Sequence, residues 1–391
     1  MISVQTALSL IESHSPRPMA ETVATAEAMG RTLAHDVKAK LSMPPFTASN
    51  MDGYALSQIE TGDILEIIGE SSAGTPFTGT ISQDQAVRIA TGAMVPDGAD
   101  RVLIQEHVIR DGERLTVMTQ PKAGEHIRLI GSDFQLGAPL LKANHHLQAP
   151  DLTLLAAAGH KKLTVNAKLR CAIFSTGDEL SPVGKPLKAG EIYAANAIGL
   201  IPLLEGWGAD VTDFGILPDD PNVISAQVKK MSDFDIIIPI GGASVGDHDH
   251  LRPVFRAAGF DMIFEQVALR PGKPSWMAKN KAQIAFGLPG NPASGFVCAH
   301  LFLRTLLGQS PQVLSAKLDG QIEENGPRET YLRGQAKSKD GQIKVTRFPC
   351  QDSYRLRPQS AANALVRVPA MGGPYLSGDV MDIILFGTLT A

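Results

Sequence analysis

Apolar residues recur at helical spacing at the start of the chain and at strand spacing soon afterwards. In the segment VQTALSLIESH, one helical face carries Val4, Ala7, Leu8 and Ile11, which is the repeat of an amphipathic helix. We expect a second helix over residues 20–33. From PPFTASNMDGYAL to about Leu140, short apolar runs such as DILEIIGE, QAVRIA, DRVLIQEHVI and RLTVMTQ alternate with Gly, Pro and Asp. Such runs are typical of strands and predict a mostly β module.

Apolar runs alternate with helical stretches in the second half of the chain. Residues 150–159 first predict a helix that packs on the chain's own N-terminus. Strands are then predicted at LRCAIFST, DVTDFGIL, DIIIPIGG, MIFEQVAL and QIAFGLPG. Helices are predicted over 195–206, 221–232 and 249–258, and a last one ends at Leu307. Continuous apolar runs are typical of parallel strands buried on both faces, so we expect a parallel α/β domain. Short strands over 312–391 predict a further small β domain.

Composition and charge are ordinary for a globular protein. The 391 residues are 43% hydrophobic and carry a net charge of -4. No basic tract is present, which argues against nucleic-acid binding, and no run approaches the ~18 apolar residues of a membrane span. The first residues lack a basic leader followed by an apolar region, so we expect a cytoplasmic protein. Cys171, Cys298 and Cys350 form no CxxC pair, so neither a disulfide framework nor a zinc ribbon is encoded.

Each predicted strand of the α/β domain is followed by a loop rich in polar or small residues. These loops are STGDEL, LPDD, GGASVGDHDH, RPGKP and GLPGNP. Because ligands of open α/β sheets bind outside the carboxyl ends of the strands, we expect glycines, carboxylates, hydroxyls and two cationic side chains to meet in one crevice.

The GLPGNP loop has the features of a phosphate site. Asn291 can cap the following helix, Pro292 suits its first position, and Gly308 can end it. Free N–H groups at the helix start, with Gly290 letting the backbone approach, favour a phosphate. A plain turn explains the same residues equally well. The glycines of GGASVGD and the hydroxyl of Ser244 would complement this site.

The same glycine-rich loop carries two carboxylates next to two histidines. Asp247 and Asp249 alternate with His248 and His250. A zinc site would need further His or Cys ligands, and no such cluster is evident. Carboxylates beside hydroxyls and phosphates suit magnesium better, so we favour magnesium over zinc. We interpret both histidines as polar residues on the first turn of the next helix.

The motifs together resemble a known family. The segments PPFTASNMDGYAL, VRIATGAMVPDGAD, STGDEL, GEIYAANAIGLIPLL, GGASVGDHDH, RPGKP and FGLPGNPASG occur in the order and at the intervals found in the bacterial molybdopterin molybdenumtransferases, the MoeA family, whose eukaryotic relatives include the gephyrin E domain. The resemblance covers essentially the whole chain. It implies an α/β plus β multidomain protein: a helical linking domain (1–42 and 139–166), an inserted β domain (43–138), an α/β molybdopterin-binding domain (167–311) and a C-terminal β domain (312–391).

The resemblance also implies a reaction and an assembly. Adenylylated molybdopterin and molybdate, with Mg²⁺, would yield molybdenum cofactor and AMP. The subunits would form a homodimer in which the α/β domain of one subunit and the inserted domain of the other share the site. Molybdopterin adenylyltransferase and the enzymes that receive the cofactor are the protein partners that this assignment suggests, while no nucleic acid and no membrane are expected.

Individual residues receive roles from the same resemblance. The residues implied for catalysis are Asp52, Thr91, Asp133, Glu179, Asp249 and Lys273. The residues implied for substrate binding are Asn196, Gly241, Gly242, Ser244, Gly246, Arg270, Pro289, Gly290, Asn291, Pro292 and Ser353. The residues implied for the metal ion and its waters are Asp219, Asp247 and Asp249. A divalent ion held by carboxylates would neutralise the charge of a phosphoanhydride during its cleavage.

Simpler structural roles compete with several of these assignments. Asp52 and Asp133 are also typical turn formers, and Thr91 can hydrogen-bond within a turn. Asp219 and Asp220 both precede a predicted helix and can cap it. For Asp220 we favour the cap.

This sequence departs from the family pattern at three places. Arg270 stands where lysine is usual, which changes a point charge into a planar fork, and Ala195 stands where an aspartate or serine is common. The stretch QDSYRLRPQSAANAL replaces a smaller, serine-rich one, although Ser353 and Asn363 remain. These differences concern the details of ligand binding.

Two other functions stay open at this point. A molybdopterin adenylyltransferase would share the α/β domain, but the presence of Asp52, Thr91 and Asp133 argues against it. A non-catalytic scaffold would keep the fold and the dimer, but it would have no need of the acidic residues proposed for the site.

Overall fold

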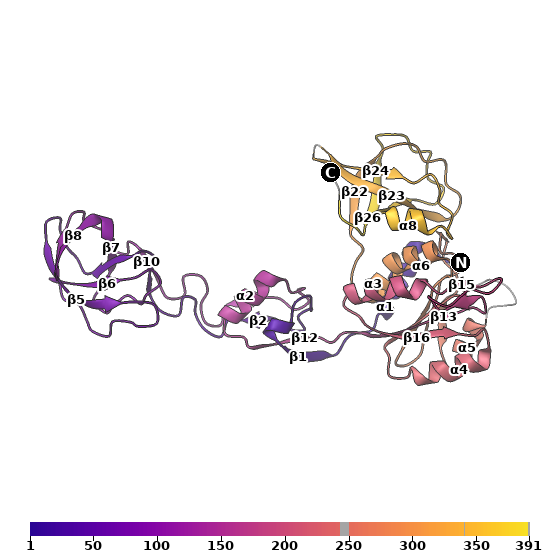
Figure 1. Ribbon diagram of the computed structural model, residues 1–391, viewed down its shortest axis with the longest axis horizontal. Helices are drawn as coiled ribbons and strands as arrows, with labels where there is room; N and C mark the ends of the chain where they lie inside the picture. Colours follow the sequence, from indigo (N-terminus) through magenta and orange to yellow (C-terminus); the bar gives the residue numbers. More distant parts are fainter. Residues whose placement is uncertain (243–249, 340, 390–391) are drawn as a thin grey trace. The chain divides into compact units, whose positions relative to one another are not determined.

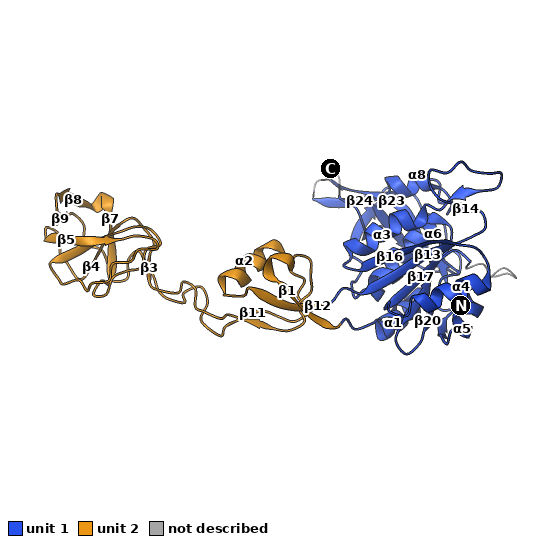
Figure 2. Ribbon diagram, turned by 60° about the horizontal axis from the view of Figure 1, so that its bottom comes forward, with its two compact units in different colours: residues 1–18, 167–391 blue, residues 19–166 orange. Residues whose placement is uncertain are grey.

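The computed structural model describes residues 1–242, 250–339 and 341–389 and forms two compact units (Figure 2). Unit 1 comprises residues 1–18 and 167–391, and unit 2 comprises residues 19–166. Unit 2 is therefore inserted into unit 1 along the chain. The predicted first helix is confirmed as α1 (Val4–His14), where the Ser3 hydroxyl caps the helix by accepting from the Thr6 N–H at 3.0 Å. α1 belongs to unit 1.

One part of unit 2 is built on strands from both of its ends. β1 (Ala20–Ala24) and β12 (Lys162–Asn166) are antiparallel, and their register runs from Ala20 opposite Asn166 to Ala24 opposite Lys162. β2 (Val37–Lys38) pairs with β11 (Pro139–Leu141). The helix expected at 150–159 is confirmed as α2 (Ala149–Ala157), and its Leu155 packs in a small core with Leu33 and Leu147.

The helix predicted over residues 20–33 is wrong. β1 and the short 3₁₀ helix η1 (Thr25–Glu27) lie there instead. Thr22 and Val23 are β-branched and favour a strand, and β12 supplies hydrogen-bond partners for the β1 backbone, which outweighs the helical propensity of the neighbouring alanines. The segment that contains α2 and β12 does return to an earlier part of the chain, where β12 pairs with β1. It does not return to α1, because α2 and α1 belong to different units.

The second part of unit 2 is the β module expected from the short apolar runs. Its sheet has the order β7-β4-β6-β5-β9-β8. The strands are β4 (Gly53–Leu56), β5 (Ile64–Ser71), β6 (Gln85–Ile89), β7 (Arg101–Ile104), β8 (Val108–Asp111) and β9 (Arg114–Val117), with η2 (Gln105–His107) between β7 and β8. β3 (Ala48–Ser49) and β10 (Ile127–Arg128) form a separate pair.

The α/β sheet of unit 1 is mixed, which corrects the expectation of a purely parallel sheet. Its order is β16-β13-β17-β21-β20-β18. The strands are β13 (Arg170–Thr176), β16 (Asp210–Leu217), β17 (Ile236–Ile240), β18 (Asp261–Phe264), β20 (Trp276–Lys279) and β21 (Ile284–Gly287). β20 is antiparallel to both of its neighbours, so β18 runs in the same direction as β21.

The segment predicted as one strand, MIFEQVAL, divides between two sheets. Its start forms β18, and its end passes into β19 (Leu269–Arg270), which pairs with β23 (Glu329–Lys339) of the C-terminal β domain. The RPGKP loop then leads into β20, whose first residue, Trp276, pairs with Gly287 at the end of β21. RPGKP therefore still lies at the carboxyl edge of the sheet, as expected.

Helices cover both faces of this sheet (Figure 1). α1, α3 (Asn196–Gly206) and the helical run of α6 (Pro292–Cys298), the π-helix η3 (Ala299–Leu303) and α7 (Arg304–Leu306) pack on one face. α4 (Pro221–Lys230) and α5 (Leu251–Ala257) pack on the other. Gly308 ends the long run with a φ of 76°, as predicted. Asp220 caps α4 by accepting from the Asn222 N–H at 2.8 Å, which confirms the simpler interpretation of that residue.

The C-terminal β domain has a six-stranded sheet of order β19-β23-β24-β22-β26-β25, and β23 also pairs with β25. Besides β19 and β23, it contains β22 (Val313–Leu318), β24 (Gln342–Arg347), β25 (Ala364–Val368) and β26 (Val380–Leu385). A short helix, α8 (Leu356–Ala361), precedes β25. The small pair β14 (Leu180–Ser181) and β15 (Ile192–Tyr193) lies between β13 and α3 in the chain.

Among residues 1–242, 250–339 and 341–389, no helix combines the length and the apolar character that crossing a membrane requires.

The contact between Gly287 and Trp276 gives a test of the packing at the carboxyl edge. A Cβ atom on Gly287 would overlap the indole ring of Trp276, which is fully buried and cannot move aside. We expect Gly287→Ala to lower the free energy of unfolding by about 1–3 kcal/mol, the usual cost of overpacking a core. Thermal unfolding followed by calorimetry measures this change.

Gly206→Ala provides the matched control. Gly206 lies in α3 and has no atom within 4 Å of the position where its Cβ would be placed, so alanine should leave the stability unchanged or raise it slightly. Equal melting temperatures for the two variants would contradict the packing described here.

Candidate functional site

Three loops at the carboxyl edge of the sheet meet through their backbones. They follow β13, β17 and β21, which are neighbours in the sheet. The Gly241 N–H donates to the Leu288 carbonyl at 3.1 Å, and a Cβ on Gly241, which has a φ of 95°, would overlap the carbonyl oxygen of Thr176. A Cβ on Gly290 would lie 3.4 Å from the Gly241 Cα. We call Gly241, Gly242 and Pro289–Pro292 the glycine cradle.

The cradle brings together several residues predicted to bind substrate. Gly241, Gly242, Pro289 and Gly290 are part of it, while Ser244 and Gly246 lie outside the described residues. The Asn196 side chain, at the start of α3, donates through Nδ2 to the Gly290 carbonyl at 2.6 Å. This bond ties a second helix start to the cradle.

Asn291 occupies the cap position of α6, but its side chain does not cap the helix as we expected. Its Nδ2 donates instead to the Ser353 hydroxyl at 3.2 Å, and the Ala293 N–H donates to the Ser353 carbonyl at 3.1 Å. Ser353 belongs to the C-terminal β domain. The substrate-binding prediction for Ser353 thus falls on the residue that links this domain to the cradle.

An acidic corner lies beside the cradle. The Asp219 N–H donates to the Asp178 carboxylate at 3.2 Å, and the Glu179 carboxylate lies against Gly177, 2.5 Å from the position of a Cβ there. Burial raises the pKa of Asp219, and the negative charges of Asp178 and Glu179 raise it further, with His250 opposing them. Two predicted residues, Glu179 and Asp219, are therefore close together. Asp178 was overlooked in the sequence, although it stands next to Glu179 in STGDEL.

The expected metal ligands are described only in part. Asp219 lies in the acidic corner, whereas Asp247 and Asp249 lie outside the described residues. Among residues 1–242, 250–339 and 341–389, no group of three or more His, Cys, Asp or Glu residues is arranged to hold a metal ion. The magnesium site thus stays a prediction.

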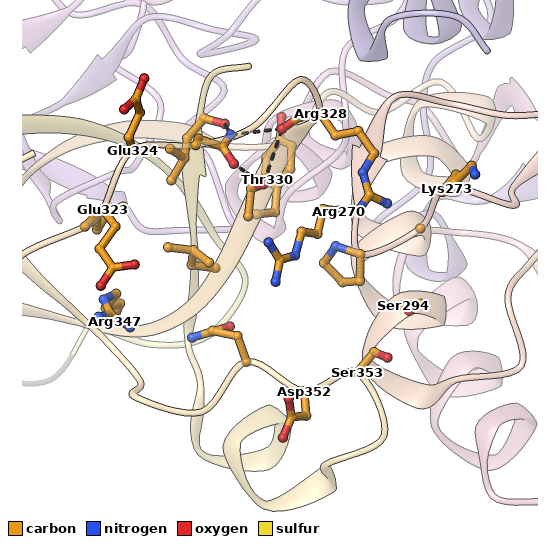
Figure 3. A pocket seen from close by; sticks show the side chains of 18 of the residues that line it. Arg270, Lys273, Ser294, Glu323, Glu324, Arg328, Thr330, Arg347, Asp352 and Ser353 are labelled. Atoms are coloured by element: carbon orange, nitrogen blue, oxygen red, sulfur yellow. Dashed lines mark hydrogen bonds between the residues drawn. The ribbon is translucent and has the colours of Figure 1, made fainter. Parts of the chain in front are cut away.

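A pocket of about 660 Å³ lies between the RPGKP loop, the start of α6 and the C-terminal β domain (Figure 3). The predicted residues Arg270, Lys273 and Ser353 line it, and so does Arg328 from the loop before β23. Within the described part of the chain, no hydrogen bond or ion pair engages the side chains of Arg270, Lys273 or Arg328. Glu323, Glu324 and Asp352 also line the pocket, but among the described residues no ion pair joins them to these three cations. Three cations without an ion-pair partner favour an anionic ligand. Arg328 belongs to none of the motifs, so no sequence pattern pointed to it.

A buried arginine fixes one wall of this pocket. Arg333 on β23 is 1% exposed, and its guanidinium donates to the carbonyls of Asp352 and Arg355, both at 2.9 Å. The Gln351 side chain accepts from the Arg333 N–H and donates to the Arg333 carbonyl, again at 2.9 Å. We call residues 351–355 the braced loop. Sequence reasoning missed Arg333 because its function depends on these distant partners.

In unit 2, two separately predicted residues form a pair. The Asp52 carboxylate accepts from the Thr91 N–H at 2.6 Å and from the Thr91 hydroxyl at 2.8 Å. These bonds, the backbone one first, lower the pKa of Asp52. Both residues are exposed, in loops beside β4 and β6. Asp133 is exposed too, and its N–H donates to the Met43 carbonyl at 3.0 Å; no described bond joins it to the pair.

The chain is similar to known proteins over nearly its whole length. Three family models match in order: the MoeA N-terminal region (domains I and II) over residues 2–159, a probable molybdopterin binding domain over 172–309, and the MoeA C-terminal region (domain IV) over 315–386. A molybdopterin molybdenumtransferase of Nostoc sp. is 36% identical over 92% of this chain and 86% of its own length. The chain belongs to the MoeA family.

Other comparisons agree with this placement. The molybdopterin molybdenumtransferase of Haemophilus influenzae is 32% identical, with full coverage of both chains. Two crystal structures of a molybdopterin biosynthesis MoeA protein from Pyrococcus horikoshii have TM-scores of 0.86 and 0.81, at 26% identity over 99% of this chain and 100% of theirs. The family predicted from the motifs is confirmed, and so is the multidomain α/β and β fold.

The Asp52–Thr91 pair in this MoeA family member gives a prediction about ionisation. Thr91→Val removes the hydroxyl donor and keeps the shape, so we expect the pKa of Asp52 to rise towards its ordinary value while the backbone bond still holds it below. Carboxyl-carbon NMR titration of both proteins measures this shift. An identical Asp52 titration in the variant would show that the hydroxyl bond is absent in solution.

The same pair contributes to stability with a definite sign. Because the folded-state pKa of Asp52 is lowered, its contribution is present above the unfolded-state pKa and is lost as the pH falls through the folded-state pKa. The stability difference between the wild type and Thr91→Val should therefore shrink as the solution is acidified below the unfolded-state pKa of Asp52.

Proposed function

We propose that this chain inserts molybdenum into adenylylated molybdopterin, taking molybdate and releasing AMP and molybdenum cofactor in the last step of cofactor biosynthesis. Its full-length relatives are molybdopterin molybdenumtransferases, and the family relationship makes this chain a transferase of the same kind. The observation that carries the detailed assignment is the set of unpaired cations, Arg270, Lys273 and Arg328, in a pocket beside the glycine cradle.

The glycine cradle is proposed to hold the phosphate of the substrate. Gly241, Gly242 and Gly290 carry no side chain that would block a ligand's approach to the backbone. Asn196 fixes the Gly290 carbonyl, and Pro292 begins α6 without an N–H of its own, leaving the following N–H groups to face a ligand or an internal acceptor. One of these, that of Ala293, is already bonded to Ser353. Ser244 and Gly246 complete the proposed set.

Arg270 and Lys273 are proposed to bind molybdate. Both side chains line the pocket, and neither forms an ion pair with a carboxylate in the described part of the chain. Hydrogen bonds from a charged donor to an oxyanion are stronger than those from a neutral donor. Arginine donates them from a planar, forked group, and lysine from a single ammonium group. Arg270 therefore keeps the charge of the lysine that is usual in the family while changing the geometry of the contact.

Mg²⁺ is proposed as the ion of the acidic corner. Asp219, Asp247 and Asp249 would hold it, and Glu179 would orient a water molecule or a molybdate oxygen. Oxygen-only ligands suit magnesium. Burial raises the pKa of Asp219, and the negative charges of Asp178 and Glu179 raise it further; a bound cation would relieve this charge repulsion. The ion would supply neutralisation of phosphate charge.

A homodimer would complete the site. We propose that Asp52, Thr91 and Asp133 of one subunit act at the α/β domain of the other, because they lie in unit 2 and the cradle lies in unit 1. The same proposal divides the chain into domains that begin at residues 43, 139, 167 and 312. One change is needed: α1, which was assigned to the linking domain, belongs to unit 1. A molybdopterin adenylyltransferase and recipient molybdoenzymes remain the proposed protein partners.

Release of AMP tests the proposed reaction. Full-length protein incubated with adenylylated molybdopterin and Mg²⁺ should release AMP when molybdate is added and not without it, as measured by chromatography. Asp52→Ala should abolish release while the protein stays folded, because Asp52 is exposed and the loss of its two bonds to Thr91 should lower the melting temperature only slightly. Release that ignores molybdate would contradict the proposed function, and full activity of Asp52→Ala would contradict the role of unit 2.

The two cations of RPGKP give a second prediction. Lys273→Gln should raise the KM for molybdate roughly 10- to 100-fold, since a hydrogen bond to a charged group contributes about 1.5–3 kcal/mol. Arg270→Gln should act in the same direction. Lys281→Gln, an exposed charge before β21, serves as the control and should leave the KM unchanged. If all three variants behaved alike, molybdate would not bind in this pocket.

A further inference from the structure

The braced loop exposes an aromatic ring on a backbone that is held from several sides. Tyr354 is 63% exposed. The carbonyls of Asp352 and Arg355, which flank it, are both bonded to the buried guanidinium of Arg333. On the residue before it, the Ser353 hydroxyl and carbonyl accept from Asn291 and Ala293.

Supporting this loop requires the burial of a charged side chain, Arg333, which is energetically costly. A guanidinium that is 1% exposed has given up its contact with water, and burying a charge is unfavourable unless hydrogen bonds compensate it. The buried guanidinium of Arg333 obtains part of this compensation from its hydrogen bonds to two carbonyls of the braced loop. Fixing a loop in advance lowers the entropy lost when a ligand binds to it.

A positive charge lies next to the exposed ring. The Arg355 guanidinium carbon is 5.7 Å from the centre of the Tyr354 ring, and the Arg355 Nε is 3.3 Å from the Asp352 carboxylate. Both charged side chains remain 53% exposed. A tyrosine on a supported backbone, with a guanidinium beside its ring, is suited to a flat ring that carries a phosphate, because the two rings can stack and the phosphate is attracted to the cation.

The position of the loop indicates which ligand would reach it. Ser353 contacts Asn291 of the glycine cradle directly, and consecutive Cα atoms are about 3.8 Å apart. Tyr354 is therefore one residue from the proposed phosphate site. Asp352 and Ser353 also line the cationic pocket, so the same loop borders both ligand regions.

We propose that Tyr354 and Arg355 form a stacking platform for a flat nitrogen heterocycle of the substrate. The inference rests on the proposed function, which supplies a substrate whose phosphates join two such rings, adenine and pterin. The platform binds one of these rings while the neighbouring phosphate lies at the cradle. It sets the affinity for the organic substrate and has no part in the chemical step.

Binding measurements on full-length protein test the platform without requiring turnover. AMP and molybdopterin lacking the adenylyl group are titrated separately by calorimetry, the latter under anaerobic conditions. Tyr354→Leu should raise the Kd for one of the two probes about tenfold, the size expected for the loss of one stacking contact. Whichever probe responds identifies the ring. Tyr354→Phe should bind like the wild type, because it keeps the aromatic face.

Variants that remove one positive charge distinguish a specific contact of Arg355 with the ligand from general electrostatic attraction to the protein surface. Arg355→Gln should weaken the same probe several-fold, and less so at high ionic strength. Arg357→Gln is the matched control, since it removes an exposed charge from the adjacent helix α8, and it should have no effect. In the AMP-release assay, Tyr354→Leu should raise the KM for adenylylated molybdopterin with kcat unchanged.

Several results would overturn the platform. They are an unchanged Kd for both probes in Tyr354→Leu, a Kd that changes equally in Tyr354→Phe, and a change of oligomeric state or melting temperature in Tyr354→Leu that accounts for the loss. Failure of the proposed function would look different: wild-type protein would release no AMP in response to molybdate, while the Tyr354 variants would still differ in probe binding.

Discussion

The site depends on three strand ends that approach closely enough for their backbones to touch. At Gly241 a side chain would overlap the Thr176 carbonyl, and at Gly290 a Cβ atom would lie 3.4 Å from the Gly241 Cα, in van der Waals contact. The hydrogen bond from Gly241 to Leu288 closes the group. Because β13, β17 and β21 are adjacent and parallel, this contact places the acidic corner, the cradle and the start of α6 within one small region. Asn196 and Ser353 are bonded to the cradle directly.

The C-terminal β domain is connected to this region by polar bonds as well as by strand pairing. β19 leaves the α/β domain to pair with β23, and Ser353 reaches back to Asn291 and Ala293. Arg333 then fixes the loop that carries Ser353. The pocket therefore takes its cations from both domains, and its shape depends on their relative position. A ligand bound by Lys273 and Arg328 would contact both domains at once.

Most of the fold could be predicted from the sequence, because apolar periodicity reports local structure. The strands of the inserted β module and the helices of the α/β domain follow this periodicity. The errors have a common physical origin in tertiary contacts. Residues 20–24 form a strand because β12 pairs with them. β20 is antiparallel to both of its neighbours, and the local sequence of a strand does not determine its direction in the sheet.

The candidate site was predictable where motifs carry it and unpredictable where distant residues complete it. The motifs led to Asp52 and Thr91, but not to the fact that the two bind each other. Asn291 was expected to cap its own helix, and a residue 62 positions later competes for its side chain. Arg328 and Arg333 belong to no motif, since a single arginine in a sequence looks the same whether it faces solvent, a pocket or a carbonyl.

The insertion of unit 2 has a consequence for how such a protein can arise. Its two ends are held side by side, because Ala20 pairs with Asn166 across β1 and β12, at the usual strand spacing of about 5 Å. For unit 1, a segment of 148 residues thus begins and ends at almost the same point. Joining chain ends this close carries little closure entropy. A gene could therefore gain or exchange such a cassette in one step, while the catalytic scaffold around it continues to fold as before.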